Sequence, residues 1–335
     1  GTGRRRVSSV PDSAHGTNPA TAAAAGGAVR TVPSDARGLV DTAALAAAVG
    51  PDTAGMMLTN PNTLGLFEVE IKKIAGLIHR AGGLLYYDGA NFNAVAGVCR
   101  PGDMGFDLVH LNVHKTMTTP HGGGGPGAGP LGASARLAPY LPGPRVQLIR
   151  ATARSPKFAW QDGGRKSIGR MKAFHGNVAI LVRAYAYLRH LGAQGLADMA
   201  RHAVLNARYL QARLAGGGGG TWRAASSEPC MHEFVLSLAP LKEASGLRVV
   251  DFAKRILDEG FYAPTVAFPL IVPEALMIEP TETETKEVLD DFAEAMGRIA
   301  AEARIDPETL SRSPRTTPVS RLDEVSANRH PILRA

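Results

Sequence analysis

The segments YYDGAN (86–91) and HLNVHKT (110–116) decide the fold, because each follows a strand-like run and carries a chemically useful side chain. Asp88 and Lys115 fall at the ends of those runs, and open α/β sheets bind ligands beyond the carboxyl ends of their strands. An aspartate and a lysine in such places are the minimum needed to hold pyridoxal phosphate. The lysine forms a Schiff base, and the aspartate keeps the pyridine nitrogen protonated so that the ring accepts electrons. The two segments therefore predict an enzyme that stabilises a carbanion.

Helix and strand patterns alternate around these segments, as in a mainly parallel sheet wrapped by helices. The predicted helices lie at 41–49 and 68–82, and the predicted strands at 53–60, 83–88 and 106–113. A short run at 7–13 resembles the tail of another strand. The chain is thus expected to begin with an α/β unit.

The second half of the chain has a different pattern. Two long helices are predicted at 176–192 and 196–215, and the glycines at 216–220 then interrupt the chain. A smaller α+β unit follows, with strands at 231–238 and 275–280 and helices at 247–259 and 283–303. We therefore expect a cofactor-binding large domain at 1–150, interdomain helices at 151–215 and a small α+β domain at 216–335.

Composition excludes several classes of protein. With 335 residues, 44% of them hydrophobic and 20% charged, the chain is expected to be globular. It has neither an apolar run long enough for a membrane span nor the apolar core of a secretory signal, so a cytoplasmic location is expected. Cys99 and Cys230 lack CxxC spacing, which argues against a disulfide framework. The net charge of +7 comes from scattered basic residues without a recognisable nucleic-acid module, so no nucleic-acid binding is expected.

A metal site is the main alternative reading of the second segment, since His110 and His114 are four residues apart and His121 follows. The apolar neighbours alternate as in a strand, however, and no carboxylate ligand completes the set. No metal is therefore expected. Asn112 and His114 are better explained as polar groups near the lysine that could reach a phosphate.

Other polar residues keep two readings. His15, in SAHGTNPA, could lie flat on a pyridine ring or satisfy a backbone carbonyl group. Asn60 and Thr63 are possible cofactor contacts in a turn. Thr281 and Glu284 have the spacing of a helix capping box, which would explain the threonine without a role in chemistry.

Two further features lie between the predicted units. The glycine-rich loop at 121–130 could approach an anion or serve as a flexible connection, because glycine allows close backbone contact. Lys166 and Arg170 could grip a carboxylate or a carrier protein, although a solvated helix start also explains them.

The chain resembles the P-protein family of the glycine cleavage system, glycine dehydrogenase (decarboxylating), and most closely subunit 2 of its split bacterial form. The resemblance runs from about residue 10 onward. It rests on long, ordered motifs: SAHGTNPA (13–20), NPNTLGLFE (60–68), YYDGANFNAVAG (86–97), the run 100–130, LAPYLP (137–142), KSIGR (166–170), MHEFV (231–235) and the run 268–287.

The resemblance implies the aspartate-aminotransferase-like fold, fold type I of pyridoxal-phosphate enzymes. Lys115 would be the Schiff-base lysine and Asp88 the partner of the pyridine nitrogen. Ala90 would lie against one face of the ring, and His15 would stack on the other. By similarity to related enzymes of this fold, Asn112 and His114 would lie near the phosphate.

The resemblance also implies a reaction and partners. Glycine would be decarboxylated, and its aminomethyl group would pass to the lipoyl disulfide of the H-protein, with P-protein subunit 1 as the partner chain. Family members carry a glycine-containing loop and helix before the HGTNPA motif, so a truncated large domain is expected. Two alternatives stay open: another enzyme of the same fold, such as an aldolase or a cysteine desulfurase, and a non-catalytic truncated subunit.

Overall fold

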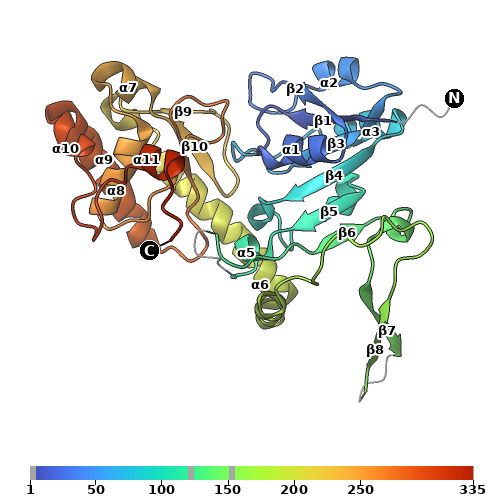
Figure 1. Ribbon diagram of the computed structural model, residues 1–335. Coiled ribbons are helices and arrows are strands. Elements are labelled where there is room, and N and C mark those ends of the chain that lie inside the picture. The colour runs from blue at the N-terminus through green and yellow to red at the C-terminus, as the bar shows by residue number, and fades with distance from the viewer. Residues whose placement is uncertain (1–4, 120–123, 151–154, 335) are drawn as a thin grey trace.

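A six-stranded sheet and a four-stranded sheet, joined by a long helix, organise the chain in this computed structural model, which describes residues 5–119, 124–150 and 155–334 (Figure 1). The first sheet has the order β2-β1-β3-β4-β5-β6. Its first five strands are parallel and β6 is antiparallel to β5. The strands are β1 Val7–Pro11, β2 Ala28–Val32, β3 Thr53–Thr59, β4 Leu84–Gly89, β5 Leu108–Leu111 and β6 Leu131–Ala133.

Helices and short turns connect these strands and provide the packing partners of the sheet. They are α1 Thr17–Ala24, α2 Thr42–Ala48, α3 Ile71–Arg80, η1 Phe92–Ala94, α4 Pro101–Met104 and α5 Val113–Thr116. In α3 the buried side chains recur at helical spacing, namely Ile71, Ile74, Ala75 and Ile78. They pack against the sheet in one cluster with Leu58, Leu85 and Tyr87.

The predicted elements of this half are confirmed, with shifts at their ends. The strands at 53–60, 83–88 and 106–113 correspond to β3, β4 and β5, and the strand tail at 7–13 corresponds to β1. Helix α3 begins three residues later than predicted because Glu68 belongs to the preceding loop. Its amide donates to the Asn60 side chain, and its carboxyl group accepts from the Val40 amide.

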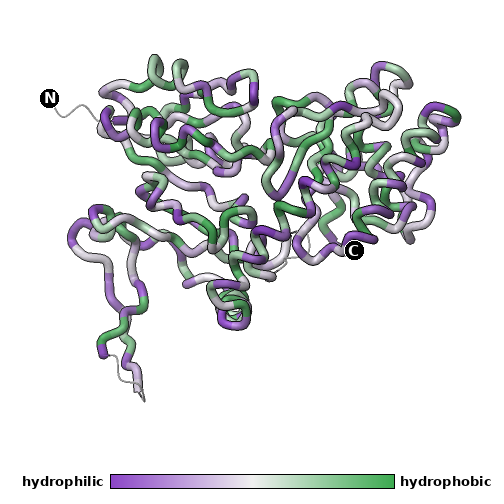
Figure 2. Tube along the Cα trace, turned by 180° about the vertical axis from the view of Figure 1, so that it is seen from behind, coloured by the Kyte–Doolittle hydropathy of each residue, from purple (hydrophilic) through white to green (hydrophobic). Residues whose placement is uncertain are grey.

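A hairpin that the sequence did not predict protrudes from the body of the molecule (Figures 1 and 2). Its strands are β7 Arg145–Arg150 and β8 Lys157–Gln161, preceded by η2 Ala138–Tyr140. Almost every hairpin side chain is exposed, including Phe158 and Trp160, so no buried face produced a recognisable alternation. Exposed apolar side chains gathered in this way are typical of contact surfaces.

Helix α6, Val178–Arg213, links the two main sheets. The predicted helices at 176–192 and 196–215 are its two parts, and the break between them is real, since Gly192 has φ 64° and ψ −173° inside the helix. That conformation is easily adopted only by glycine. The first part packs Ile180 and Ala184 against α5, and the second packs Met199 and Ala200 against Ala96.

The four-stranded sheet has the order β11-β12-β10-β9 and is antiparallel throughout. Its strands are β9 Arg223–Ala224, β10 Phe234–Ser237, β11 Thr265–Val266 and β12 Ala275–Ile278. The associated helices are η3 Gly217–Gly219, α7 Ala239–Ser245, α8 Val249–Asp258, α9 Lys286–Ile305, α10 Pro307–Ser311 and α11 Glu324–Arg329. The predicted strands and helices of this unit are confirmed, and the domain limits at 150 and 215 stay a prediction.

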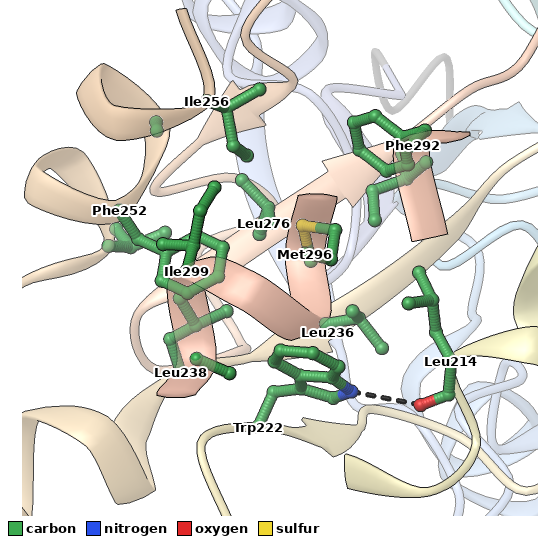
Figure 3. Close-up of a cluster of buried hydrophobic side chains, with 14 of the residues drawn as sticks. Leu214, Trp222, Leu236, Leu238, Phe252, Ile256, Leu276, Phe292, Met296 and Ile299 are labelled. Carbon is green, nitrogen blue, oxygen red and sulfur yellow. Dashed lines mark hydrogen bonds between the residues drawn. The ribbon is translucent and has the colours of Figure 1, made fainter. Parts of the chain in front are cut away.

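The core of this second unit is built between α8, α9 and the sheet (Figure 3). Phe252 and Ile256 from α8 meet Met296 and Ile299 from α9 over Leu276. Trp222 lies at the edge of the cluster, where its indole N–H donates to the Leu214 carbonyl oxygen at 2.9 Å. A buried polar group is thereby satisfied without interrupting the apolar packing.

The predicted capping box of the last long helix is wrong. The helix α9 begins at Lys286, and its N-cap is Thr285, whose hydroxyl accepts from the Val288 amide at 3.4 Å. Thr281 lies four residues outside the cap, where its hydroxyl bonds with that of Thr283 at 2.7 Å. A capping role therefore does not explain Thr281.

Within the described residues, no helix is both long and apolar enough to span a membrane.

The core of the second unit can be tested with a matched pair of substitutions. Ile256 is 1% exposed in α8, and Ile305 is 86% exposed at the end of α9. We expect Ile256→Ala to lower the free energy of unfolding by about 2–5 kcal/mol, because it leaves a cavity, and Ile305→Ala to change it by less than ~0.5 kcal/mol. Urea unfolding of both variants measures this. Equal shifts of the two unfolding midpoints would contradict the packing described.

Candidate active site

A cavity of about 1140 Å³ runs along one face of β3 and β4 to the carboxyl ends of β3, β4 and β5 and reaches the four-stranded sheet. Five of the residues predicted for the site line it: His15, Asp88, Ala90, Asn112 and Lys115. His114 instead lines a neighbouring cavity of about 660 Å³, beside the described part of the glycine-rich loop, and Asn112 lines both. The structure therefore brings the predicted aspartate and lysine together.

Asp88 is held rigidly at the end of β4. Its carboxylate is buried, with one oxygen accepting from the Asn18 side-chain amide and the other from the Ala90 backbone amide, both at 3.1 Å. The His110 Nε2 atom lies 3.6 Å from the carboxylate. Hydrogen bonds from several donors stabilise the charged form of a buried carboxyl group. Asp88 is thus suited to pair with a protonated nitrogen.

A short hydrogen-bonded chain runs beside Asp88. The His110 ring bonds to Asn112 through Nε2 at 2.8 Å and to the Tyr86 hydroxyl through Nδ1 at 2.6 Å. Since the Asn112 carbonyl oxygen only accepts, Nε2 donates, and Nδ1 of the neutral ring accepts from Tyr86. Burial, aided by the nearby Asp88, raises the pKa of Tyr86 to about 12. Tyr86 therefore remains a donor at neutral pH.

His15 lies at the mouth of the cavity, after β1. Its Nδ1 accepts from the Thr17 amide at 3.1 Å, and its ring centroid is 5.5 Å from that of Phe268. The hydrogen bond leaves Nε2 to carry the proton of the neutral ring. His15 is exposed, so its imidazole face is available to a ligand in the cavity. A buried carbonyl partner, the alternative in the sequence analysis, is not the contact seen.

Lys115 lies in the single helical turn α5, immediately after β5. The turn is anchored by apolar contacts of Val113 and Met117 with Ile180 of α6. At the next residue, the Thr116 hydroxyl group donates a hydrogen bond to the Asn93 side chain. Packing on both sides therefore fixes the backbone that carries the lysine.

Two residues of the loop after β3 were candidate cofactor contacts: Asn60 has a structural role, and Thr63 lines the cavity. Asn60 is fully buried, and its carboxamide oxygen accepts from the Glu68 amide at 3.0 Å. Thr63 lines the cavity, and its hydroxyl donates to the Ser13 carbonyl oxygen. The Thr59 hydroxyl, at the end of β3, also lines the cavity and has no hydrogen-bond partner among the described residues. Thr59 is therefore available to a ligand.

Other candidates from the sequence lie elsewhere. The described lining of the cavity includes neither Lys166 nor Arg170, and the Lys166 ammonium lies 5.9 Å from the centroid of the Tyr140 ring. Of the histidines considered as zinc ligands, His110 makes hydrogen bonds through both ring nitrogens, and His121 lies outside the described residues.

His232 and Glu233, immediately before β10, and Glu279, immediately after β12, form a group whose two carboxyl-bearing residues line the cavity. His232 and Glu233 are buried, and Glu279 is exposed. The ligand-type atoms of this group all lie within 4.8 Å of one another. However, amides from the first unit already bond to the carboxyl groups: Asn91 donates to Glu233 at 2.7 Å and Asn93 donates to Glu279 at 2.9 Å. We interpret the group as a hydrogen-bonded contact between the two units.

Burial shifts the pKa values of His232 and Glu233. It lowers the pKa of His232, which is therefore neutral. Burial, reinforced by the adjacent Glu279, raises the pKa of Glu233 well above its usual range, although the Asn91 hydrogen bond and the Lys115 charge act in the opposite direction. Glu233 therefore retains a proton at pH values where an exposed glutamate has lost it.

Several of these residues could not be predicted from the sequence. Asn18 and Glu233 lie in motifs quoted for the family resemblance, SAHGTNPA and MHEFV, but no spacing rule assigned them a role. Asn91 and Asn93 follow Asp88 closely, so position after a strand end was the available signal. Glu279 comes from a strand predicted to belong to another unit, and only the folded chain places it here.

Two family models match the chain. Residues 11–235 match the model described as aminotransferase class-V, and residues 199–315 match the C-terminal domain of glycine dehydrogenase. The probable glycine dehydrogenase (decarboxylating) subunit 2 of Methylococcus capsulatus is 56% identical over 324 residues, 97% of this chain and 65% of that protein. The corresponding protein of Thiobacillus denitrificans is 54% identical over 329 residues, 98% of this chain and 67% of that protein. The chain thus spans about two thirds of these relatives.

Solved structures share the fold. A glycine decarboxylase (P-protein) of the glycine cleavage system, in an inhibitor-bound form, has a TM-score of 0.71 at 23% identity over 89% of this chain and 66% of that chain. A cysteine desulfurase from Escherichia coli has a TM-score of 0.67 at 20% identity over 89% of this chain and 73% of that chain. These similarities confirm the predicted fold class, the aspartate-aminotransferase-like α/β fold.

The buried Glu68, which shapes the loop next to the cavity, should make the stability of the chain depend on pH. Burial raises its pKa to about 7, although hydrogen bonds from Val40 and Asn62 act in the opposite direction. The folded chain thus binds the proton more tightly than the unfolded chain does. This contribution to stability is complete below about pH 4.5 and is lost as the pH rises through about 7.

We expect Glu68→Gln to remove that dependence and to exceed the wild type in stability at pH 8, by at most on the order of 3 kcal/mol. The difference should shrink as the pH falls towards 4.5. Urea unfolding at a series of pH values measures it, with the exposed Glu243→Gln as control. A constant difference at all pH values would show that Glu68 is not protonated preferentially in the folded state.

Proposed function

Because the chain belongs to the aminotransferase class-V family and to the glycine dehydrogenase (decarboxylating) subunit 2 family, we propose that it binds pyridoxal 5′-phosphate and decarboxylates glycine. The observation that carries the proposal is the shared cavity of Asp88 and Lys115. Asp88 is buried and held by two hydrogen bonds, while Lys115 lies on a separately anchored turn. This is the arrangement that the cofactor requires.

The residues present fit the cofactor. Lys115 would hold its aldehyde carbon, Asp88 its pyridine nitrogen, and Ala90 and His15 its two ring faces. Asn112, which lines both cavities, and His114 would lie towards its phosphate. The unpartnered Thr59 hydroxyl gives the cavity a further polar group for the ligand. When bound, the cofactor supplies an electron sink for the electron pair that stays on the substrate carbon after carbon dioxide has left.

The chain's own residues would set the conditions for that chemistry. Asp88 would hold a proton at the pyridine nitrogen, and the Asn18 and Ala90 donors would keep its carboxylate oriented towards it. His110, bonded to Tyr86 and Asn112, would fix the side of the cavity next to Asp88. Because these groups are ordered by packing before a ligand arrives, little reorganisation is needed during the reaction.

The proposed partners follow from the family. We propose that the aminomethyl group passes to the lipoyl disulfide of an H-protein and that a subunit 1 chain completes the enzyme, in the cytoplasm. The net charge of +7 would favour an acidic carrier. Another reaction on the same cofactor, of the aldolase or cysteine desulfurase type, would use the same lysine and aspartate. A non-catalytic subunit would not need them.

Lys115→Ala separates these readings. With subunit 1 and lipoylated H-protein present, we expect the wild type to exchange labelled bicarbonate into the carboxyl group of glycine and Lys115→Ala to lose this exchange, because the attachment point of the cofactor is removed. Lys72→Ala, on the exposed side of α3, should retain it. Cofactor binding without exchange in the wild type would reject decarboxylation. Undiminished exchange in Lys115→Ala would remove Lys115 from the chemistry.

Asp88→Asn tests the electron sink. Asparagine keeps one acceptor oxygen, enough for only one of the Asn18 and Ala90 donors, and it cannot hold a proton at the pyridine nitrogen. We therefore expect the exchange rate to fall by about 100-fold or more. The absorption spectrum of the bound cofactor shows whether binding persists. A variant that binds the cofactor normally and exchanges at the wild-type rate would contradict the role of Asp88.

A further inference from the structure

The loop after β3 packs closely against the backbone of Glu233. The backbone of Gly65 lies directly against it: a methyl group on Gly65 would meet the Glu233 carbonyl oxygen at 1.8 Å, and Gly65 itself has a φ of 78°. Just before it, the Met231 amide donates to the Gly65 carbonyl oxygen at 2.7 Å. The loop after β3 therefore fixes where the strand β10 begins, and with it the Glu233 side chain.

Asn91 fixes the other end of the same side chain. Its amide nitrogen donates to Glu233 Oε1 and also to the backbone carbonyl oxygens of Pro61 and Asn62, at 2.7, 3.2 and 3.1 Å. Oε1 is thus engaged, while Oε2 lies 3.9 Å from the nearest nitrogen of His232. A carboxyl group held through one oxygen retains the other for exchange of a proton.

Among the described residues, the titratable groups that act on or respond to Glu233 are Cys230, His232, Glu279 and Lys115. Cys230 and His232 precede β10, Glu279 follows β12, and Lys115 belongs to α5 across the cavity. Burial raises the pKa of the Cys230 thiol to about 12, so this thiol stays neutral. His232 is neutral because it is buried, and Glu279 is partly exposed. Glu279 and Lys115 both act on the charge of Glu233, in opposite directions, and of these two only Lys115 carries an amino group.

We propose that Glu233 is the proton-exchange partner of the Lys115 amino group. In one direction, the Lys115 ammonium gives a proton to the Glu233 carboxylate, which leaves a neutral amine and a neutral carboxyl group. In the other direction, the carboxyl group returns the proton. No electrons are transferred and the charge of the pair is unchanged, so the step can occur in a buried cavity without exposing a net charge.

This inference deepens the proposed function, since a lysine attacks a carbonyl or imine carbon only as the neutral amine. In the proposed reaction, the Lys115 amino group would give up the cofactor's aldehyde carbon to the substrate amine and would take it back when the product departs. Each exchange moves a proton between amines, and a nearby carboxyl group with a raised pKa is suited to carry it.

The test uses the full 335-residue chain without cofactor and measures the titration of Lys115 directly. Acetic anhydride acylates only neutral amines, and mass spectrometry of the peptide containing Lys115 gives its reactivity at each pH. Glu233→Gln keeps an oxygen that accepts the Asn91 hydrogen bond but removes the ionisable group. We expect it to move the Lys115 midpoint to lower pH by about one unit, because the ammonium loses its counter-charge.

Two variants serve as controls. Glu233→Asp retains a carboxyl group and should keep the midpoint closer to the wild type than Glu233→Gln does, whereas a merely structural role would favour the longer glutamine. Glu284→Gln, exposed and outside the cavity lining, should leave it unchanged. An unchanged Lys115 midpoint in a folded Glu233→Gln variant would overturn the proposal. So would stoichiometric binding of Zn²⁺ that depends on Glu233, since the group would then be a metal site.

The reciprocal measurement remains if Glu233→Gln does not fold. Lys115→Met should move the titration of the buried carboxyl group, followed by its infrared C=O band, to higher pH, because coupling between two sites acts equally in both directions. An unmoved band would overturn the proposal. A failure of the proposed function would give a different result. If the reconstituted wild type showed no bicarbonate exchange while Glu233→Gln still displaced the Lys115 midpoint, glycine decarboxylation would be rejected and the proton exchange between Glu233 and Lys115 would be supported.

Discussion

The cavity depends on one row of the parallel sheet, in which Thr59, Asp88 and His110 lie side by side at the ends of β3, β4 and β5. Residues in register on neighbouring strands point to the same face and lie about 5 Å apart. The Asp88 carboxylate is thereby flanked by a hydroxyl group and an imidazole. A slip of one residue would turn Asp88 to the opposite face, so the register of this row determines whether a site exists.

The hydrophobic packing of the first unit protects that register. Leu58 and Tyr87 immediately precede Thr59 and Asp88 and are buried in the same cluster as the apolar face of α3. Because strand side chains alternate between faces, burying these residues directs the following polar side chains to the cavity face. The polar site is thus a consequence of the apolar pattern next to it.

Local patterns were sufficient to predict elements whose burial is periodic. The strands β3, β4 and β5, the amphipathic helix α3 and the break at Gly192 all have such patterns, and Asp88 and Lys115 could be assigned because they follow strands. The hairpin β7–β8 was missed since its side chains are exposed on both faces. The capping prediction failed because Thr281 and Thr285 are both plausible caps in sequence, and only the path of the chain selects Thr285. Asn91, Asn93, Glu233 and Glu279 meet through contacts between units, which no local pattern encodes.

Two of the carboxyl groups that line the cavity, those of Asp88 and Glu233, differ in a way that divides the chemistry between them. Asp88 accepts hydrogen bonds on both oxygens, from Asn18 and Ala90, which stabilises a carboxylate. Glu233 has one donor, Asn91, and lies beside another carboxyl group, so the neutral form is favoured. Asp88 is thus oriented by donors on both oxygens, whereas burial raises the pKa of Glu233, so Asp88 is suited to a fixed partner and Glu233 to carrying a proton. Asn91 and Asn93 join the two units by donating to Glu233 and Glu279, and burial of Glu233 in this contact is what favours its neutral form. The position of the small α+β unit and the protonation of Glu233 are therefore coupled. Moving that unit away would separate Glu233 from Asn91 and expose its carboxyl group to water, where the carboxyl group would lose its proton.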